Sequence, residues 1–343
     1  MLTDKRLSVV VACYRDEGSV REMLRQLRAV LQRITPEWEI IYVNDASPDN
    51  AEEVLLEEAK SDPRLTVISH SRNFGAQVAF TTGLTQAMGD AVVIMDGDMQ
   101  DPPELIEDFV KKWIDGYDVV YGIRAKRHES FVRNIGYKLF YRLFKKISYI
   151  TIPLDAGEFS LMDRVVVEVI LGCHENDRLI RGLRAYAGFK QTGVEFERPK
   201  RFAGESTQSF LDYLMWAFKS FVSYSLFPLR LITSIAFLMA GGTMLLMLYI
   251  LSAYITSFFV VSIKAPPGYM LMMMVLLLLG TGIMLSLGVI GEYLGRLFLE
   301  IKKRPQPVLS VLINDHRKSP RAWLGRCGTP PTQPHSWRAD KGS

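Results

Sequence analysis

Acidic side chains gather at three places in the chain, each directly after a short apolar run. Residues 92–104, VVIMDGDMQDPPE, end their apolar run with Asp96 and Asp98. Residues 13–19, CYRDEGS, and residues 44–50, NDASPDN, follow the same pattern. A single stretch of this kind is weak evidence, because Asp and Asn also start turns and cap helices. Three acidic strand ends in one sheet predict a site for a nucleotide and a metal ion.

The stretch at residues 92–104 has the oxygen ligands that a hard divalent cation prefers. Carboxylate and amide oxygens suit Mg²⁺ or Mn²⁺, and such an ion keeps a phosphate as a co-ligand. Asp96, Asp98 and Gln100 are therefore the predicted metal ligands. Gly97 separates the two aspartates and has no side chain to keep a metal-bound diphosphate away from the backbone.

The elements that must position these residues alternate between two periodicities over the first 120 residues. Short buried strands are predicted at Leu7–Ala12, Glu39–Asn44, Leu65–Ser69, Ala91–Met95 and Asp118–Gly122. Helical periodicity is found between them, over Ser19–Ile34, Asn50–Lys60, Ala76–Met88 and Pro103–Gly116. Repeated strand–helix units predict an α/β fold with a mostly parallel sheet and helices on both faces. In such sheets ligands bind beyond the carboxyl ends of the strands, where the acidic stretches lie.

Composition excludes several other classes of protein. The chain has 343 residues, of which 48% are hydrophobic and 23% charged, and this suits an ordered core. A formal net charge of +4 is too small over this length to indicate nucleic-acid binding. The three cysteines are scattered, which favours a reducing compartment, and the five histidines show no zinc-ligand spacing. The charged N-terminal stretch does not resemble a signal peptide.

Two long uncharged runs in the second half predict membrane spans. The runs are Leu231–Ile263 and Ala265–Gly291, with Lys264 between them. Each exceeds the ~20 residues that a helix needs to cross a bilayer. Basic residues flank the pair on both outer sides, so the positive-inside rule predicts a multi-pass protein with both termini cytoplasmic.

Amphipathic segments precede these spans. Residues Ser209–Phe227 place Phe210, Leu214 and Phe218 on one helical face, which predicts an interfacial helix, with packing on the soluble domain as the alternative. Phe131–Ser148 is a second basic and aromatic candidate. The predicted organisation is a cytoplasmic catalytic domain, an interfacial helix, a transmembrane hairpin, a cytoplasmic segment and a disordered tail. Their respective ranges are 1–205, 206–228, 229–299, 300–318 and 319–343.

Taken in order, the motifs resemble those of the family 2 inverting glycosyltransferases, and among them the polyisoprenyl-phosphate glycosyltransferases. The motifs are CYRDEGS, VNDASPDN, SRNFGAQVAFTTG, MDGDMQDPPE, DAGEFSLMDR, RPKRFAGESTQS and GVIGEYLGR. The resemblance covers roughly residues 5–312. It implies a Rossmann-like GT-A domain that moves a sugar from a nucleotide-sugar donor to a polyisoprenyl (undecaprenyl) phosphate at the inner membrane.

The resemblance also implies roles for residues that contact the donor. The first motif, which binds the base and ribose, falls on Ala12, Tyr14 and Asp16. Val43 and Asp45 fall on the second motif, whose aspartate binds the base.

Further residues match positions that contact the diphosphate and the acceptor. Asp96 and Gly97 match the diphosphate and metal position, and Asp98 with Gln100 supplies the remaining metal ligands. Arg124 and Arg201 match arginines that hold donor or acceptor phosphate, and Asp155 matches a carboxylate needed near the acceptor. The predicted catalytic residues are therefore Asp155, Asp96 and Arg124. Three more arginines, Arg127, Arg133 and Arg198, are either further phosphate clamps or a basic surface facing anionic lipid.

The chain departs from the family pattern at four positions. Ala12 replaces a proline, Arg15 an asparagine and Asp16 a glutamate, and Thr207 replaces a phosphate-binding lysine. These departures concern the donor contacts and not the class of enzyme. A UDP-hexose such as UDP-glucose is the expected donor, with GDP-mannose as the runner-up. A polysaccharide synthase is disfavoured because residues 177–189, DRLIRGLRAYAGF, lack a Q-x-x-R-W motif. A nucleotidyltransferase does not explain the spans, and a non-enzymatic membrane adaptor does not explain the acidic strand ends.

The C-terminal part contains one more predicted element. PQPVLSVLIN, residues 305–314, reads as a strand that pairs with another subunit, so a homo-oligomer is expected, a tetramer by resemblance. The Pro/Gly-rich residues after 318 are predicted to be disordered.

Overall fold

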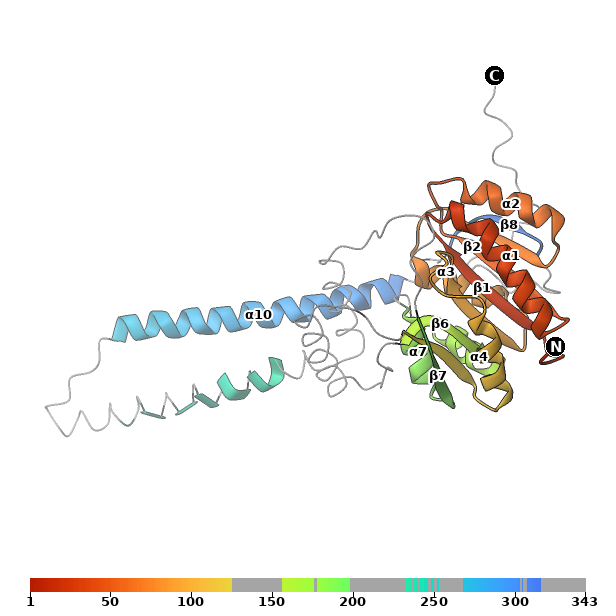
Figure 1. Cartoon of the computed structure of the whole chain (residues 1–343). Coiled ribbons are helices and arrows are strands. Elements are labelled where there is room, and N and C mark those ends of the chain that lie inside the picture. Colours follow the sequence, from red (N-terminus) through yellow and green to blue (C-terminus); the bar gives the residue numbers. More distant parts are fainter. Residues whose placement is uncertain are drawn as a thin grey trace, which may run out of the picture. The chain divides into compact units, whose positions relative to one another are not determined.

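A computed structural model shows an eight-stranded sheet in the order β7-β5-β6-β4-β1-β2-β3-β8 (Figure 1). The structure describes residues 1–124, 156–175, 178–197, 268–302, 304 and 307–315, together with short stretches between 232 and 252. Four of the seven strand pairings in this described part are parallel, namely β1 with β2, β1 with β4, β2 with β3, and β5 with β7. The predicted mostly parallel α/β sheet is confirmed.

The strands and helices of the first 124 residues agree with the sequence prediction to within a few residues. The strands are β1 (Leu7–Cys13), β2 (Trp38–Asn44), β3 (Leu65–His70), β4 (Ala91–Asp96) and β5 (Val119–Arg124). The helices are α1 (Glu17–Ile34), α2 (Ala51–Ser61), α3 (Ala76–Gln86) and α4 (Leu105–Ile114). β1, β2 and β3 are buried along their whole length, which is why they appear in the sequence as continuous apolar runs.

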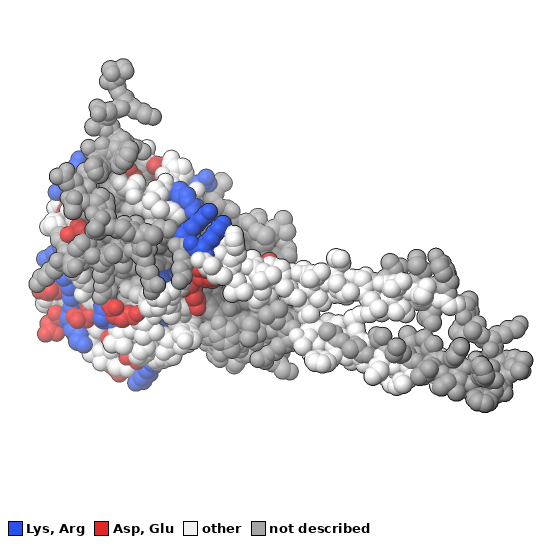
Figure 2. Space-filling model, turned by 180° about the vertical axis from the view of Figure 1, so that it is seen from behind, with Lys and Arg blue, Asp and Glu red and all other residues white. Residues whose placement is uncertain are grey.

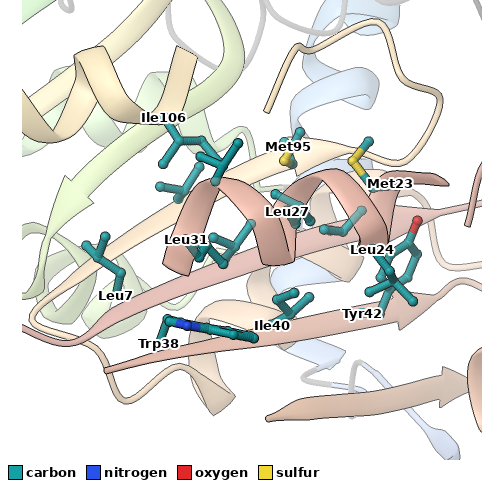
Figure 3. Close-up of a cluster of buried hydrophobic side chains, with 14 of the residues drawn as sticks. Leu7, Met23, Leu24, Leu27, Leu31, Trp38, Ile40, Tyr42, Met95 and Ile106 are labelled. Carbon is teal, nitrogen blue, oxygen red and sulfur yellow. The ribbon is translucent and has the colours of Figure 1, made fainter. Parts of the chain in front are cut away.

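The sheet buries two cores, one on each face. Alternate residues of β1 point to opposite faces, with Val9 and Val11 in one core and Val10 in the other. α1, α2 and α4 cover the first face, and α3 covers the second together with α6 (Arg164–Gly172) and α7 (Ile180–Ala187). Figure 3 shows the apolar stripe of α1 packed on β1, β2 and β4. The two covered faces leave the strand ends as the place where polar residues can gather.

Two strands on the β5 side of the sheet were not predicted. β6 (Ala156–Asp163) lies between β4 and β5 and runs antiparallel to both, and β7 (Gln191–Phe196) pairs with β5 in parallel. The antiparallel β6 reverses the direction expected from strict strand–helix repetition. Its beginning therefore lies at the same edge of the sheet as the ends of β4 and β5.

The C-terminal strand exists, but its partner is not the predicted one. β8 (Leu309–Ile313) pairs antiparallel with β3 of the same chain, from Ile313 beside Val67 to Leu309 beside His70. The prediction that this strand pairs with another subunit is wrong for this structure. No strand from the first 124 residues pairs with the outer edge of β3, and β8 pairs with that edge. The homo-oligomer stays a prediction.

One helix forms most of the described part of the second half. α10 (Gly268–Lys302) belongs to a compact unit separate from the sheet. Among the described residues, a single stretch, Leu278–Lys302, is long and apolar enough to span a membrane. The described atoms of α10 are uncharged along most of its length in Figure 2. The helix continues past Gly291, where the uncharged run ends, and past residue 299, the predicted end of the hairpin, to Lys302. Most of the first predicted span, the predicted interfacial helix and the predicted disordered tail lie outside the described residues.

Candidate active site

The ends of β1 and β4 meet at the carboxyl edge of the sheet. Ala12 pairs with Asp96 in the parallel ladder, and the Gly97 amide donates to the Ala12 carbonyl at 2.9 Å. The Ser19 hydroxyl, in the first turn of α1, lies 2.8 Å from the Asp16 carbonyl and 2.6 Å from the Gly97 carbonyl. Two of the acidic stretches are therefore joined by hydrogen bonds, as their positions in the sequence predict.

The backbone at Gly97 is closely surrounded. A Cβ atom there would lie 3.0 Å from the Ala12 carbonyl oxygen, 3.3 Å from the Tyr42 hydroxyl and 3.4 Å from Asp16 Oδ2. The space normally taken by a side chain is thus filled by three oxygen atoms. A glycine at this position lets the two loops approach each other.

The carboxylate of Asp16 faces this junction and does not cap α1. Asp16 precedes the helix, yet its side chain makes no capping hydrogen bond to it. Its Oδ2 accepts from the Tyr14 amide at 3.1 Å, and the residue is only 8% exposed. Asp49, by contrast, accepts from the Glu17 and Ala51 amides at 3.0 and 3.2 Å and acts as a turn residue. An Asp before a helix commonly accepts hydrogen bonds from the first helical amides. Asp49 has this role, and the side chain of Asp16 does not.

The loop after β4 folds back on itself around its aspartates. Asp98 Oδ1 accepts from the Gln100 amide at 3.0 Å, and Asp101 Oδ2 accepts from the Asp96 amide at 3.3 Å. Asp98 and Asp101 are buried, whereas Asp96 and Gln100 are partly exposed. Met99 adopts a left-handed backbone conformation with φ of 62°. The three predicted metal ligands therefore lie on one tight loop, and Asp101 closes it.

Two buried groups beside the site have pKa values raised first by burial and then by nearby acidic groups. Burial raises the pKa of the Tyr42 hydroxyl well above its usual value, and Cys13, Asp16 and Asp98 raise it further. Burial also raises the pKa of the Cys13 thiol, with Asp16 and Asp49 as additional causes. A site of this kind favours a cation.

The oxygen atoms of this loop suit a divalent metal ion that takes its remaining ligands from a bound substrate. Within the described ranges, no group of three or more His, Cys, Asp or Glu side chains is arranged to hold an ion without other ligands. Asp96, Asp98 and the side-chain amide of Gln100 supply hard oxygen atoms. Mg²⁺ usually completes its octahedral coordination with water and phosphate oxygens. The residues present are therefore compatible with an ion that binds together with a diphosphate.

The third acidic stretch is fixed by Asp45, which is 3% exposed. Its Oδ1 lies 2.7 Å from His70 Nδ1 and accepts from the Phe74 amide at 2.8 Å. Its Oδ2 accepts from the Gly75 amide at 2.7 Å. Asp45 thereby ties the end of β2 to the segment between β3 and α3. Val43 is fully buried in β2 and contributes to the packing under this edge.

Basic residues occupy the neighbouring part of the same edge. Arg124 ends β5, and its guanidinium would lie 3.4 Å from a Cβ atom at Gly157 in β6. Arg181 Nε lies 3.8 Å from Glu158 Oε1. Arg184 Nη2 donates to the Gly157 carbonyl at 3.4 Å. The described part of this edge thus combines three arginines with one glutamate.

Arg184 is the most buried of these arginines. Its side chain is fully enclosed, and its guanidinium lies 5.1 Å from the centre of the Tyr121 ring. Burial lowers the pKa of Arg184 to about 10, while Glu158 and Tyr121 oppose the shift. The residue stays protonated near neutral pH, so it brings a fixed positive charge to the base of the edge.

Comparison with known protein families identifies the class of enzyme. The family model described as Glycosyl transferase family 2 matches residues 8–171. The uncharacterized glycosyltransferase YkcC of Bacillus subtilis is 39% identical over 299 residues, which are 87% of this chain and 91% of that protein. The chain belongs to glycosyltransferase family 2.

Other relatives of this glycosyltransferase match over nearly its whole length. The prophage bactoprenol glucosyl transferase homolog of Escherichia coli K12 is 33% identical over 89% of this chain and 98% of the relative. Among solved structures, the mannosyltransferase PcManGT from Pyrobaculum calidifontis, in complex with GDP-Man and Mn²⁺, is 22% identical. It covers 58% of this chain and 59% of its own, with a TM-score of 0.42. The protein is thus an enzyme of the glycosyltransferase class, related to bactoprenol glucosyl transferases.

The structure of this glycosyltransferase brings most of the predicted donor residues together. Ala12, Tyr14 and Asp16 lie at the end of β1, beside the loop that carries Asp96 and Asp98. Arg124 lies on the same edge, two strands from β4. Asp155 and Arg201 lie outside the described residues, as do Arg127, Arg133, Arg198 and Thr207.

Several residues of the site were not singled out from the sequence. They are Ser19, Tyr42, His70, Gly157, Glu158, Arg181 and Arg184. Ser19 lies within the quoted motif CYRDEGS, so its place in the first turn of α1 was an available signal. His70 and Arg184 are buried polar residues whose partners come from distant segments, and the local pattern gave no such signal.

Proposed function

We propose that this protein transfers a hexose from a nucleotide sugar to a polyisoprenyl phosphate, with inversion, at the cytoplasmic face of a membrane. UDP-glucose is the proposed donor and undecaprenyl phosphate the proposed acceptor. The observation that carries the proposal is the division of one sheet edge into an acidic part and a basic part.

The acidic part supports binding of the donor. Asp16, Asp96 and Asp98 lie at the adjoining ends of β1 and β4, and carboxylates gathered in this way favour a cation. A Mg²⁺ or Mn²⁺ ion held by Asp96, Asp98 and Gln100 would offset the charge that develops on the leaving diphosphate. Asp45 closes the same edge on the side of β2 and β3.

The basic part supports binding of an anionic acceptor. Arg124 lies next to β6, and arginine binds phosphate through paired N–H groups. The enclosed Arg184 adds positive charge behind it without reaching a ligand. The relatives named bactoprenol glucosyl transferases match 88–92% of the chain, including the region of the predicted spans. α10 includes a stretch long enough to cross a bilayer, which favours a lipid acceptor over a soluble one.

The chemistry then requires positioning more than deprotonation. A phosphate oxygen of the acceptor attacks the anomeric carbon, the bond from that carbon to the diphosphate breaks, and the electron pair leaves with the nucleoside diphosphate. The attacking phosphate is already anionic near neutral pH, since the second pKa of a phosphate monoester is about 6. Arg124 would hold this anion against repulsion by the diphosphate, and Asp155 would orient the acceptor side.

A transfer assay with the full-length protein in detergent tests the proposal. Radiolabelled UDP- and GDP-sugars are offered separately with undecaprenyl phosphate and Mg²⁺ or Mn²⁺, and the labelled lipid is identified. Asp98→Ala removes one predicted metal ligand and is expected to abolish transfer while the protein stays folded. Asp90→Ala is the matched control. Asp90 lies just before β4, at the opposite end of the strand, where it accepts from the Arg6 amide at 2.9 Å.

Three results have distinct meanings. Lipid labelling from UDP-glucose that disappears in EDTA and in Asp98→Ala supports the proposal. Labelling from GDP-mannose alone would replace the donor but keep the reaction. Turnover by Asp98→Ala equal to that of Asp90→Ala, or unchanged in excess EDTA, would remove the metal from the mechanism.

A further inference from the structure

His70 lies at the end of β3 with both ring nitrogens in contact with oxygen atoms. The residue is 2% exposed. Its Nδ1 lies 2.7 Å from Asp45 Oδ1, and its Nε2 lies 3.0 Å from the Thr82 hydroxyl. The side chain therefore bridges the end of β2 and the middle of α3.

The partner of Nδ1 determines that this nitrogen donates. The Thr82 hydroxyl lies 2.8 Å from the Val78 carbonyl and 3.0 Å from His70 Nε2, and the tautomer of His70 decides which of the two receives its proton. The carboxylate of Asp45 accepts from His70 Nδ1. Because a carboxylate offers no proton, Nδ1 carries the proton of this contact.

The same carboxylate organises the segment from 71 to 75. A carboxylate has about four acceptor positions, two on each oxygen. His70 and the Phe74 amide use both positions of Asp45 Oδ1. The Gly75 amide uses one position of Oδ2, which leaves one acceptor position on Oδ2 within the hydrogen bonds of the described residues.

Other contacts hold the segment itself in place. The His70 ring meets the Phe74 ring edge-on at 5.5 Å, and the Arg72 guanidinium lies 4.0 Å from the Phe74 ring centre. Gly75 has a φ of +95°, which a residue with a side chain rarely adopts. The direction of the Asp45 carboxylate is therefore fixed by His70 from one side and by this segment from the other.

We propose that His70 is a positioning residue of the donor site and acts through Asp45. The pair aims the remaining acceptor position of Oδ2 at an N–H group of the nucleobase, and uracil and guanine both present such a group. This inference rests on the proposed function, because it requires a nucleotide-sugar donor. An apolar side chain at position 70 would fill a similar volume but leave the Asp45 carboxylate without this N–H donor.

Two substitutions at position 70 separate positioning from packing. His70→Leu removes the donor to Asp45. His70→Asn keeps a side-chain N–H near the position of Nδ1. Ser8→Ala is the matched control, since it removes a buried hydrogen bond of 2.6 Å to Glu39 at the opposite end of the sheet.

The readout is the donor KM, measured beside kcat and the acceptor KM in the full-length protein. His70→Leu is expected to raise the donor KM about tenfold, which equals about 1.4 kcal/mol, with kcat and the acceptor KM within about twofold of wild type. His70→Asn is expected to recover most of that loss. Ser8→Ala is expected to keep the wild-type donor KM even if its melting temperature falls.

A wild-type donor KM in His70→Leu overturns the inference, and so does an equal loss in the Leu and Asn variants. If His70→Leu does not fold, Thr82→Val removes the hydrogen-bond partner of Nε2 and is expected to raise the donor KM about threefold, so an unchanged value overturns the inference. Failure of the wild-type protein to use either UDP- or GDP-sugars defeats the proposed function itself, a result separate from normal wild-type transfer with an unaffected His70→Leu.

Discussion

Replacing Gly97 by alanine adds a methyl group where the ends of β1 and β4 meet. The new carbon would lie 3.0 Å from the Ala12 carbonyl oxygen and 3.3 and 3.4 Å from oxygens of Tyr42 and Asp16. The Ala12 carbonyl belongs to a central strand and cannot retreat. The loop that carries Asp96 must therefore shift by a few tenths of an ångström.

The structure sets the size of the effect. The shift lengthens the 2.9 Å hydrogen bond from the Gly97 amide to the Ala12 carbonyl, and losing such a bond costs about 0.5–1.5 kcal/mol of stability. The same shift moves the carboxylates of Asp96 and Asp98. A misplacement of about 1 Å can cost roughly 10²-fold in rate, so a few tenths are expected to lower kcat by about fivefold. We also expect half-maximal activity to need more Mg²⁺ or Mn²⁺.

The assay is sugar transfer to the polyisoprenyl phosphate at saturating substrates over a range of metal concentrations, together with thermal unfolding. Gly172→Ala is the control, because nothing lies within 4 Å of a Cβ atom at that position in α6. A Gly97→Ala enzyme with the kcat and metal dependence of Gly172→Ala would refute the assignment of this loop as the place where metal and diphosphate bind.

Two further predictions concern the centre of the edge and its acceptor side. Asp155→Asn is expected to cost at least ~10²-fold in transfer rate, with donor binding little changed. Measured against pH, a loss that shrinks above the second pKa of the phosphate indicates that Asp155 accepts a proton, and a loss that persists indicates that it orients the acceptor. Normal turnover at every pH contradicts both roles. Tyr42→Phe removes a buried hydroxyl that has no hydrogen-bond partner among the described residues. The melting temperature is therefore expected to stay or to rise by an amount equivalent to about 1 kcal/mol, and a clear fall would show that the hydroxyl is bonded.

The parallel part of the fold was predictable because its strands are buried on both faces. β4 ends at Asp96, one residue after the predicted end, and β1 ends at Cys13, one residue after its prediction. Since the strand ends were located this closely, the loops that follow them were located too. The acidic part of the site therefore followed from the sequence.

In the basic part only Arg124 followed from the sequence, because the remaining residues depend on contacts between distant segments. β7 is a half-exposed edge strand with only Phe196 buried, so its periodicity is weak. Arg184 reads as a surface residue of a helix, since charged side chains are seldom fully buried. Its hydrogen-bond partner Gly157 is 27 residues away, and His70 meets Asp45 across 25 residues. No local pattern reports such pairs.

The antiparallel direction of β6 explains why a catalytic carboxylate is expected before a strand and not after one. The other predicted site aspartates follow parallel strands, whose ends lie at the carboxyl edge. β6 runs the opposite way, so its first residue, Ala156, pairs with Ile123, beside Arg124 at that same edge. Continuing the register of β4 and β6 by two residues brings Glu158 opposite Asp96. The described chain therefore enters the edge at Ala156, between its acidic and basic parts. A carboxylate one residue earlier is suited to orient an acceptor phosphate there, and this role of Asp155 stays a prediction.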